Sequence, residues 1–409
     1  MLTVLYQTTC ETIAKTIESD LSAAFTSQVE TKSLDASSAT SSMEVPAWDD
    51  LLIVIFDANP YPDAGNKFIE IYKAQRGENT AILPVAVDPS KKRPPQEVEA
   101  IKALPFDGTD LSRQQLVNRS GAMLGLRWQG RDSNLFISYR EKDGKVIAEQ
   151  VYAYFTALGH RPFLDQAQEI DGLTRILPGS PVQKEIDKAL DSANLILLID
   201  TPEAPGSVWI KHEIETADAL MLPVLPITFR ATDDRKKGPR FPSLGSLGRW
   251  VALPLADSRT PAPLAEAQLE DIVSEAENYY CDIFRRKCRV PYLVETEFKS
   301  HGFTWNALNL RLLIFESTKK HNTRINTSVL SHCSIFDQIH TPAIRRFMGF
   351  LETAARANRS LFIYDGELLS EPQMEGIARD HEGSDLIILH HQELATLIET
   401  NFTALRMAP

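Results

Sequence analysis

Short apolar runs alternate with amphipathic stretches along the whole chain of 409 residues. The runs are rich in Val, Ile and Leu and are bounded by Gly, Pro or Asp, which is typical of strands buried in a parallel sheet. Alternation of such strands with helices predicts right-handed crossovers and a doubly wound α/β sheet. At roughly 100–200 residues per domain, the length indicates two to four domains.

The middle of the chain shows this pattern most clearly. Its apolar runs predict five strands, at 135–140, 161–165, 194–200, 224–229 and 250–253. Apolar residues at helical spacing predict the connecting helices, at 145–158, 181–191, 208–220 and 264–285. A long loop with Gly and Pro occupies 166–180. The pattern therefore predicts one five-stranded domain over residues 131–285.

The first 130 residues repeat that plan in outline. LTVLYQ at 2–7 parallels LFISYR at 135–140, and LLIVIFD ending at Asp57 parallels LILLID ending at Asp200. The offset stays between 133 and 143 positions, as loop-length changes in an internal duplication would produce. Chance similarity between strands of like composition is the alternative. In this module we expect the Ser-rich segment 33–42 to be a flexible loop.

Residues 286–409 follow the pattern less clearly. Apolar runs predict strands at 311–315, 360–364 and 385–389, and an amphipathic stretch predicts a helix over 342–357. This indicates a third α/β module, to which the pattern assigns neither a topology nor a role.

Composition excludes several classes of protein. With 43 Lys+Arg against 55 Asp+Glu, the net charge is −12, so we expect no direct nucleic-acid partner and no anionic membrane surface. The four cysteines form neither a disulfide framework nor a paired CxxC zinc pattern, so no metal site is predicted. No run approaches the roughly 18 apolar residues of a membrane span. The N-terminus lacks the features of a signal peptide, and we expect a cytoplasmic protein with reduced thiols.

Four short segments of the middle module form a recognisable set of motifs. Phe-Ile-Ser-Tyr-Arg occupies 136–140, Phe-Leu-Asp 163–165, Pro-Gly 178–179 and Trp-Ile-Lys-His-Glu 209–213. In this order they resemble the first strand, the start and end of the BB loop, and the helix after the third strand of TIR (Toll/interleukin-1 receptor) domains of the bacterial NAD-cleaving type. The resemblance covers about 131–285. It implies a flavodoxin-like, doubly wound parallel sheet of five strands, flanked by an N-terminal TIR-like module and a C-terminal α/β module.

Many TIR domains outside animal signalling adaptors cleave NAD between nicotinamide and ribose. The resemblance implies the same activity here, that of an NAD+ nucleosidase, with ADP-ribose and a cyclised product both open. NAD+ is then the substrate, and no further cofactor is expected. A carboxylate beside the sugar stabilises the positive charge that grows on the ribose as the bond breaks. Glu213 is the candidate catalytic residue, although a solvated glutamate is the alternative for it.

Three candidate binding residues emerge at the carboxyl end of the first strand, the edge where ligands bind in open α/β sheets. Arg140 offers a fork of donors to a phosphate, unless it forms an ion pair with Glu141 or Asp165. Ser138 offers a hydrogen bond to a phosphate or ribose. Tyr139 completes this group, and both it and Ser138 can instead simply close the strand.

Aromatic residues complete the predicted site. Trp209 and Glu213 are four positions apart on one helix and therefore share a face. Phe163 and Trp209 are candidates for a cation–π contact with the pyridinium ring, and core packing is the alternative for both. Asp165 is included among the binding residues, although it more readily shapes the BB loop.

The first module lacks this charged set. Its first strand ends Leu5-Tyr6-Gln7 where the middle one ends Ser138-Tyr139-Arg140. Four positions after Phe68, which matches Trp209, stands Tyr72 instead of a glutamate. If the duplication is real, we expect a catalytically degenerate TIR-like module that serves contacts, autoinhibition or ligand sensing.

Other motifs add little. The basic cluster at 235–240 is expected to be solvated surface, and there is neither a GxGxxG nor a Walker motif. The family resemblance implies self-association through the BB loop at 166–180, with a sensor protein or a nucleotide second messenger as the activating partner. By analogy the setting is antiphage immunity. The alternatives are a non-enzymatic TIR scaffold in signalling and, less favoured, a nucleoside deoxyribosyltransferase-like enzyme.

Overall fold

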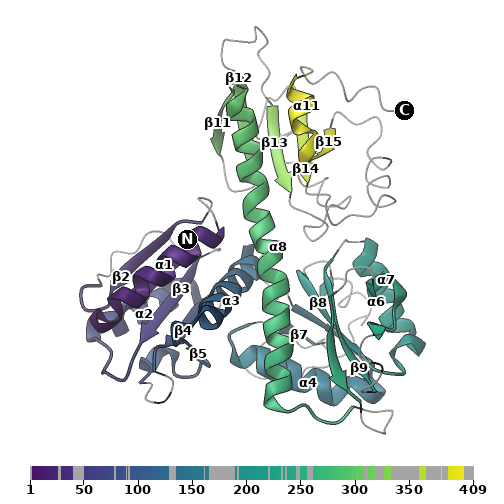
Figure 1. The fold of residues 1–409 in the computed structure, drawn as a ribbon, viewed down its shortest axis with the longest axis horizontal. Coiled ribbons are helices and arrows are strands. Elements are labelled where there is room, and N and C mark those ends of the chain that lie inside the picture. The colour runs from purple at the N-terminus through teal and green to yellow at the C-terminus, as the bar shows by residue number, and fades with distance from the viewer. Residues whose placement is uncertain are drawn as a thin grey trace. The chain divides into compact units, whose positions relative to one another are not determined.

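The regular elements of the protein form three five-stranded sheets (Figure 1). The computed structural model describes residues 2–25, 29–39, 50–77, 80–88, 90, 93–128, 135–160, 162–164, 189–190, 193–219, 222–231, 234, 237–245, 249–255, 261–301, 303–307, 312–317, 327–332, 359–364, 379 and 386–399. The chain divides into two compact units. The first contains residues 1–24, 29–218 and 223–284, and the second contains residues 25–28, 219–222 and 285–409.

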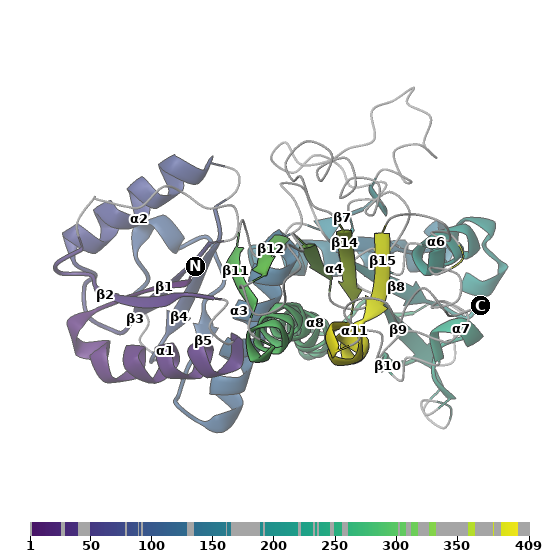
Figure 2. The same ribbon diagram turned by 90° about the horizontal axis from the view of Figure 1, so that it is seen from above.

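The first sheet is parallel throughout and has the strand order β2-β1-β3-β4-β5. Its strands are β1 (Leu2–Tyr6), β2 (Thr31–Asp35), β3 (Leu51–Phe56), β4 (Ile82–Ala86) and β5 (Leu104–Pro105). Its helices are η1 (Thr8–Cys10), α1 (Glu11–Phe25), α2 (Asp63–Arg76), η4 (Gln96–Val98) and α3 (Asp110–Trp128). Every residue of β3 is buried, because α1 and α2 lie on opposite faces of the sheet (Figure 2).

One expectation for this sheet is wrong in part. The segment 33–42 was expected to be a loop, but residues 33–35 belong to β2, which pairs in parallel with β1. The residues of β2 are only half-buried, as in an edge strand, so the segment lacks the apolar run that marks a central strand. Backbone pairing with β1 therefore determines this strand.

The second sheet is also parallel, with the order β10-β9-β8-β6-β7. Its strands are β6 (Leu135–Ser138), β7 (Pro162–Phe163), β8 (Leu195–Asp200), β9 (Val224–Arg230) and β10 (Val251–Pro254). Its helices are α4 (Glu141–Ala157), η5 (Ala204–Gly206), α6 (Val208–Ala219), α7 (Pro242–Gly245) and α8 (Glu266–Ser300). Counted from the first strand of each, the two sheets have the same order, 2-1-3-4-5, which is the flavodoxin-like arrangement. The doubly wound parallel α/β fold predicted for the middle of the chain is confirmed.

One helix of this module is longer than expected, and another lies mostly outside the described residues. The closing helix, expected to end at 285, continues to Ser300 as α8 and crosses Pro291, a residue that usually disfavours a helix interior. Most of the expected helix 181–191 lies outside the described residues, as does the BB loop at 166–180.

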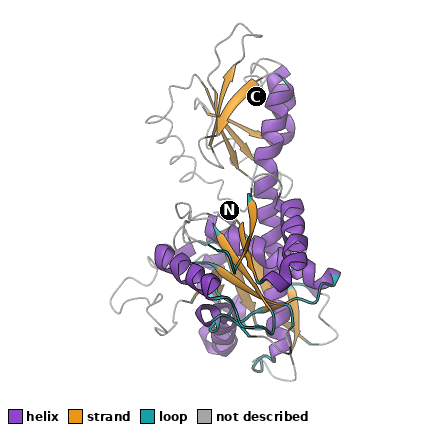
Figure 3. Cartoon of the chain, turned by 90° about the vertical axis from the view of Figure 1, so that its left-hand side faces the viewer, coloured by secondary structure: helices purple, strands orange, loops and turns teal. Residues whose placement is uncertain are grey.

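The third sheet is mixed and belongs to the second unit. Its strands are β11 (Phe303–Ala307), β12 (Leu312–Ser317), β13 (Thr327–His332), β14 (Arg359–Tyr364) and β15 (Leu386–His390), followed by η9 (His391–Glu393) and α11 (Leu394–Glu399). They follow one another in chain order, β11 to β13 antiparallel and β13 to β15 parallel. Figure 3 shows these strands at the top in orange. The expected helix 342–357 lies outside the described residues. No helix in the described part of the chain is long and apolar enough to cross a membrane.

Candidate active site

The strand order of the second sheet reverses between β6 and β8. The two strands are hydrogen-bonded neighbours, yet the chain leaves β6 toward the edge strand β7 and leaves β8 toward β9 on the other side. In open α/β sheets such a switch point leaves a crevice at the carboxyl ends of the two strands. Ser138 is the last residue of β6 and pairs in register with Leu198. Ser138 therefore lies at the edge where folds of this type bind ligands.

Ser138 and Glu213 meet at this edge. The Ser138 hydroxyl donates a hydrogen bond of 2.5 Å to Oε2 of Glu213, which lies on α6, the helix after β8. Ser138 is 1% exposed and Glu213 7%. Glu213 is therefore a buried acid that faces the strand end, and the solvated alternative is wrong for this structure.

Trp209 is exposed although it lies on the same helix. Trp209 lies about one helical turn before Glu213, and 58% of its surface is accessible. Val208 beside it is 77% exposed. Trp209 is thus at the surface, whereas Glu213, four positions later on the same helix, is buried.

Arg140 is the N-cap of α4 and lies one residue beyond Tyr139. Among the described residues its ion-pair partner is Asp143, with Nη1 3.3 Å from Oδ1. Glu141 instead faces Lys145, at 3.9 Å. Tyr139 packs against the first turn of α4, since a Cβ placed on Gly144 would lie 3.3 Å from the Tyr139 Cβ.

Phe163 packs against the sheet. Its ring stacks on that of Phe136, with centroids 5.5 Å apart and an interplanar angle of 18°. Phe136 is buried in β6, whereas Phe163 is half-buried. Phe163 thus has a packing role and keeps part of its surface accessible. Asp165 lies outside the described residues.

Comparison with known protein families covers the same part of the chain. Residues 135–264 match the model of the TIR domain. This segment is a TIR domain. No curated protein matches the chain significantly.

Three solved structures show weak likeness to the chain. The TIR domains of the activated Roq1 resistosome, which directly recognises the pathogen effector XopQ, are 15% identical, with a TM-score of 0.22 over 37% of this chain and 85% of theirs. The C-terminal domain of glucosamine-fructose-6-phosphate aminotransferase from Francisella tularensis is 10% identical, with a TM-score of 0.22 over 69% and 84%. D-lactate dehydrogenase from Escherichia coli is 11% identical, with a TM-score of 0.17 over 69% and 95%. Scores this low carry no structural or functional inference.

Two features of the TIR domain were missed from its sequence. Arg240 was expected to be solvated, but its backbone N–H donates to Oδ2 of Asp200 at 2.9 Å and its Nη1 donates to the Asp200 carbonyl at 2.8 Å. Asp200 ends β8 and is fully buried, and burial raises the pKa of its carboxyl although Arg240 and Arg230 oppose this. Only the pattern of an acid ending a buried strand could have indicated this contact. The second missed feature is Asp143, which is buried next to Arg140.

The corresponding edge of the first sheet is closed by its own side chains. Gln7, which matches Arg140, donates to the carbonyls of Asn59 and Pro60 at 3.2 and 3.0 Å and accepts from the Asp57 N–H at 2.8 Å. Tyr72, which matches Glu213, is 1% exposed and packs in the core. These positions hold loops and core in place, whereas their counterparts in the TIR domain supply a buried carboxylate and an arginine.

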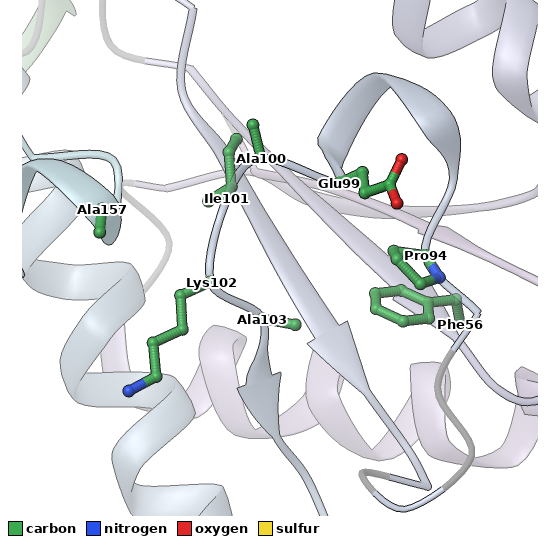
Figure 4. Close-up of a pocket in the computed structure, with 8 residues that line it drawn as sticks. All are labelled: Phe56, Pro94, Glu99, Ala100, Ile101, Lys102, Ala103 and Ala157. Carbon is green, nitrogen blue, oxygen red and sulfur yellow. The ribbon is translucent and has the colours of Figure 1, made fainter.

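A cavity of about 230 Å³ lies elsewhere in the first unit (Figure 4). It is lined mostly by the segment before β5, together with Phe56, Pro94 and Ala157 of α4. Lys102 in its wall donates to the Tyr154 hydroxyl at 2.7 Å and to Glu266 at 2.9 Å. No residue of the predicted site lines this cavity. It lies where the segment before β5 meets α4 of the TIR domain.

Proposed function

We propose that the TIR domain cleaves the bond between nicotinamide and ribose in NAD+, with Glu213 as the catalytic residue. The observation that carries this proposal is the hydrogen bond from Ser138 to the buried Glu213 at the switch point of the sheet. A buried acid held by a donor at a ligand-binding edge is typical of a functional site.

The chemistry needs one well-placed negative charge. As the glycosidic C–N bond breaks, its electron pair leaves with the pyridine nitrogen, which neutralises the pyridinium, and positive charge grows on the ribose. The Glu213 carboxylate stabilises this charge, and its burial strengthens the attraction. Water then adds to the anomeric carbon and loses a proton, which gives ADP-ribose. Attack by an adenine nitrogen in place of water gives the cyclic product.

The neighbouring residues supply binding groups. Arg140 carries donors suited to a phosphate, and Trp209 at the surface presents an open aromatic face to a pyridinium ring. NAD+ is anionic at its phosphates while the chain has a net charge of −12, so affinity must depend on such local donors. NAD+ is the only small molecule that this mechanism requires.

We extend the proposal to regulation by assembly. The TIR resemblance implies self-association and a role in antiphage immunity. Control of the activity is needed because an unregulated NAD-cleaving enzyme would exhaust the NAD+ of its own cell. The exposed pair Val208 and Trp209 offers an apolar contact next to the site. The same pair favours the second candidate function, a TIR scaffold that binds partners without catalysis.

Nicotinamide release by the purified full chain tests these functions. NAD+ is incubated with the protein, free and tethered at high density, and Glu213→Gln is compared with wild type. Glu215→Gln is the matched control, because Glu215 is an exposed acid on the same helix. We expect release by wild type and by Glu215→Gln, and a loss of at least 100-fold in Glu213→Gln. Silence of wild type in every state contradicts the enzyme and favours the scaffold, whereas full activity of Glu213→Gln contradicts the catalytic role of Glu213. Nucleosides in the same assay test the deoxyribosyltransferase-like alternative.

A further inference from the structure

Asp143 is a buried acid that no hydrogen bond satisfies. It lies in the first turn of α4, and only 9% of its surface is exposed. Neither of its carboxylate oxygens has a hydrogen-bond partner among the residues described. A carboxylate at this position of a helix often bonds back to the N-cap N–H, and Asp143 does not. A buried carboxylate to which no group donates a hydrogen bond costs stability. Its presence here therefore points to a role for Asp143 other than helix capping.

The charged neighbour of Asp143 is Arg140. Nη1 of Arg140 lies 3.3 Å from Oδ1 of Asp143, close enough for an ion pair but without the alignment of a hydrogen bond. In the described part of the chain, the Arg140 guanidinium has no other ion-pair partner, and its side chain is 26% exposed. Its fork of donors is therefore available at the edge of the sheet.

The backbone fixes this arrangement. The carbonyl of Arg140 accepts from the N–H of Gly144 at 2.8 Å, which ties the N-cap to the first turn of α4. Gly144 approaches β8 so closely that a Cβ there would lie 3.5 Å from Cγ2 of Ile199. The start of α4, which carries Asp143, therefore packs against β8.

We infer that Asp143 is a positioning residue that holds the Arg140 guanidinium at the crevice, with its donors directed to the pyrophosphate of a dinucleotide. This inference rests on the proposed function, and it specifies which part of the substrate the site recognises beyond the ribose. The buried carboxylate attracts the guanidinium without using its hydrogen-bonding fork, which leaves the planar donors for a phosphate.

Two other roles for Asp143 make different predictions. As a purely structural charge at a helix N-terminus it would affect stability and leave ligand affinity unchanged. As a competitor for Arg140 it would weaken phosphate binding, so that its removal would tighten the binding. The positioning role alone predicts weaker binding of phosphate-bearing ligands that depends on Arg140.

The test measures binding of ADP-ribose to the full chain by titration calorimetry, and cleavage of NAD+ and of nicotinamide riboside, which has no phosphate. We expect Asp143→Asn to weaken ADP-ribose binding and raise the KM for NAD+ by roughly tenfold, as for residues coupled in one ion-pair network. Its cleavage of nicotinamide riboside should equal that of wild type. In an Arg140→Gln background the same substitution should cause no further loss. Glu141→Gln, an exposed acid in the same turn, is the matched control.

The outcomes separate the two proposals. Unchanged or tighter ADP-ribose binding in Asp143→Asn overturns the positioning role, as does a loss that adds fully to that of Arg140→Gln or an equal loss with the riboside. If Asp143→Asn does not fold, the smaller Asp143→Ser replaces it. If wild type binds ADP-ribose but never releases nicotinamide, the proposed function fails, while the binding measurements still decide the role of Asp143.

Discussion

The Ser138 hydroxyl lies 2.5 Å from a carboxylate oxygen of Glu213, although the two residues are 75 positions apart in the chain. One ends a strand and the other begins the second turn of a helix that follows the neighbouring strand. Their contact connects two elements on either side of the switch point, and it holds a buried carboxyl group at the carboxyl edge of the sheet.

Removal of the Ser138 hydroxyl tests this contact. Ser138→Ala removes one hydrogen bond to the buried Glu213, and a hydrogen bond to a charged group contributes about 1.5–3 kcal/mol. We expect kcat/KM for NAD+ to fall by roughly 10- to 100-fold. Thr156→Ala, on the exposed side of α4, is the control, and equal rates in both variants would argue against the site.

Trp209 should matter for activity and little for stability. Because it is 58% exposed, we expect Trp209→Ala to change the free energy of unfolding by no more than about 0.5 kcal/mol. NAD+ cleavage should fall nonetheless, through loss of ring contact with the pyridinium or of contact with a second copy. Urea unfolding, kinetics and light scattering distinguish these effects. Val146→Ala, at a similarly exposed apolar position on α4, should change none of them. A Trp209→Ala protein with normal kinetics and association would refute the prediction.

The lowered pKa of Glu277 should make the stability of the protein depend on pH. This buried acid of α8 accepts from Nε of Arg119 at 2.7 Å and lies 3.1 Å from Nε2 of His160. Burial acts to raise the pKa of Glu277, but the charge of Arg119 and the hydrogen bond with His160 outweigh it, so the pKa is lowered. A lowered folded-state pKa stabilises the protein above the unfolded value of about 4.3, and this stability is lost as the pH falls further.

The variant Glu277→Gln measures that contribution. At pH 7 it leaves the buried Arg119 unpaired, and we expect a loss of about 3–5 kcal/mol in the free energy of unfolding. Urea unfolding at pH 7, 5 and 3.5 should show the difference from wild type shrinking toward acid. A difference that stays constant over this range would mean that the carboxylate charge is not responsible.

Gly65 tests the packing of the first sheet. A Cβ at this position of α2 would lie 2.7 Å from the Cβ of Ala36 and equally close to a ring carbon of Tyr61. We expect Gly65→Ala to destabilise the protein by about 1–3 kcal/mol, since overpacking outweighs the better helix propensity of alanine. Gly206→Ala meets open space and should stay within about 0.5 kcal/mol of wild type in the same urea titration. Equal stability of the two variants would show that α2 can shift freely.

The fold of the TIR domain could be predicted because its central strands, such as β6 and β8, are buried on both faces. A run such as Leu195–Asp200 needs no partner to be recognised, since every residue in it is buried. The edge strand β2 was missed for the opposite reason: its residues are only half-buried, and its strand conformation depends on pairing with β1. The mixed topology of the third sheet likewise depends on pairing between strands far apart in the chain, which local pattern does not specify.

Local sequence pattern specifies the alternation of strands and helices, and it was enough to place Ser138 and Arg140 at the end of the first strand of the TIR domain and Glu213 within the helix after its third strand. Tertiary structure alone decided which of these side chains are buried and which charges meet. Asp143 and Arg240 look like ordinary charged residues in the sequence, yet one is enclosed beside Arg140 and the other binds the end of β8. Burial and pairing depend on the strand order that brings distant segments together, and these two properties set the energy of a charge in a protein.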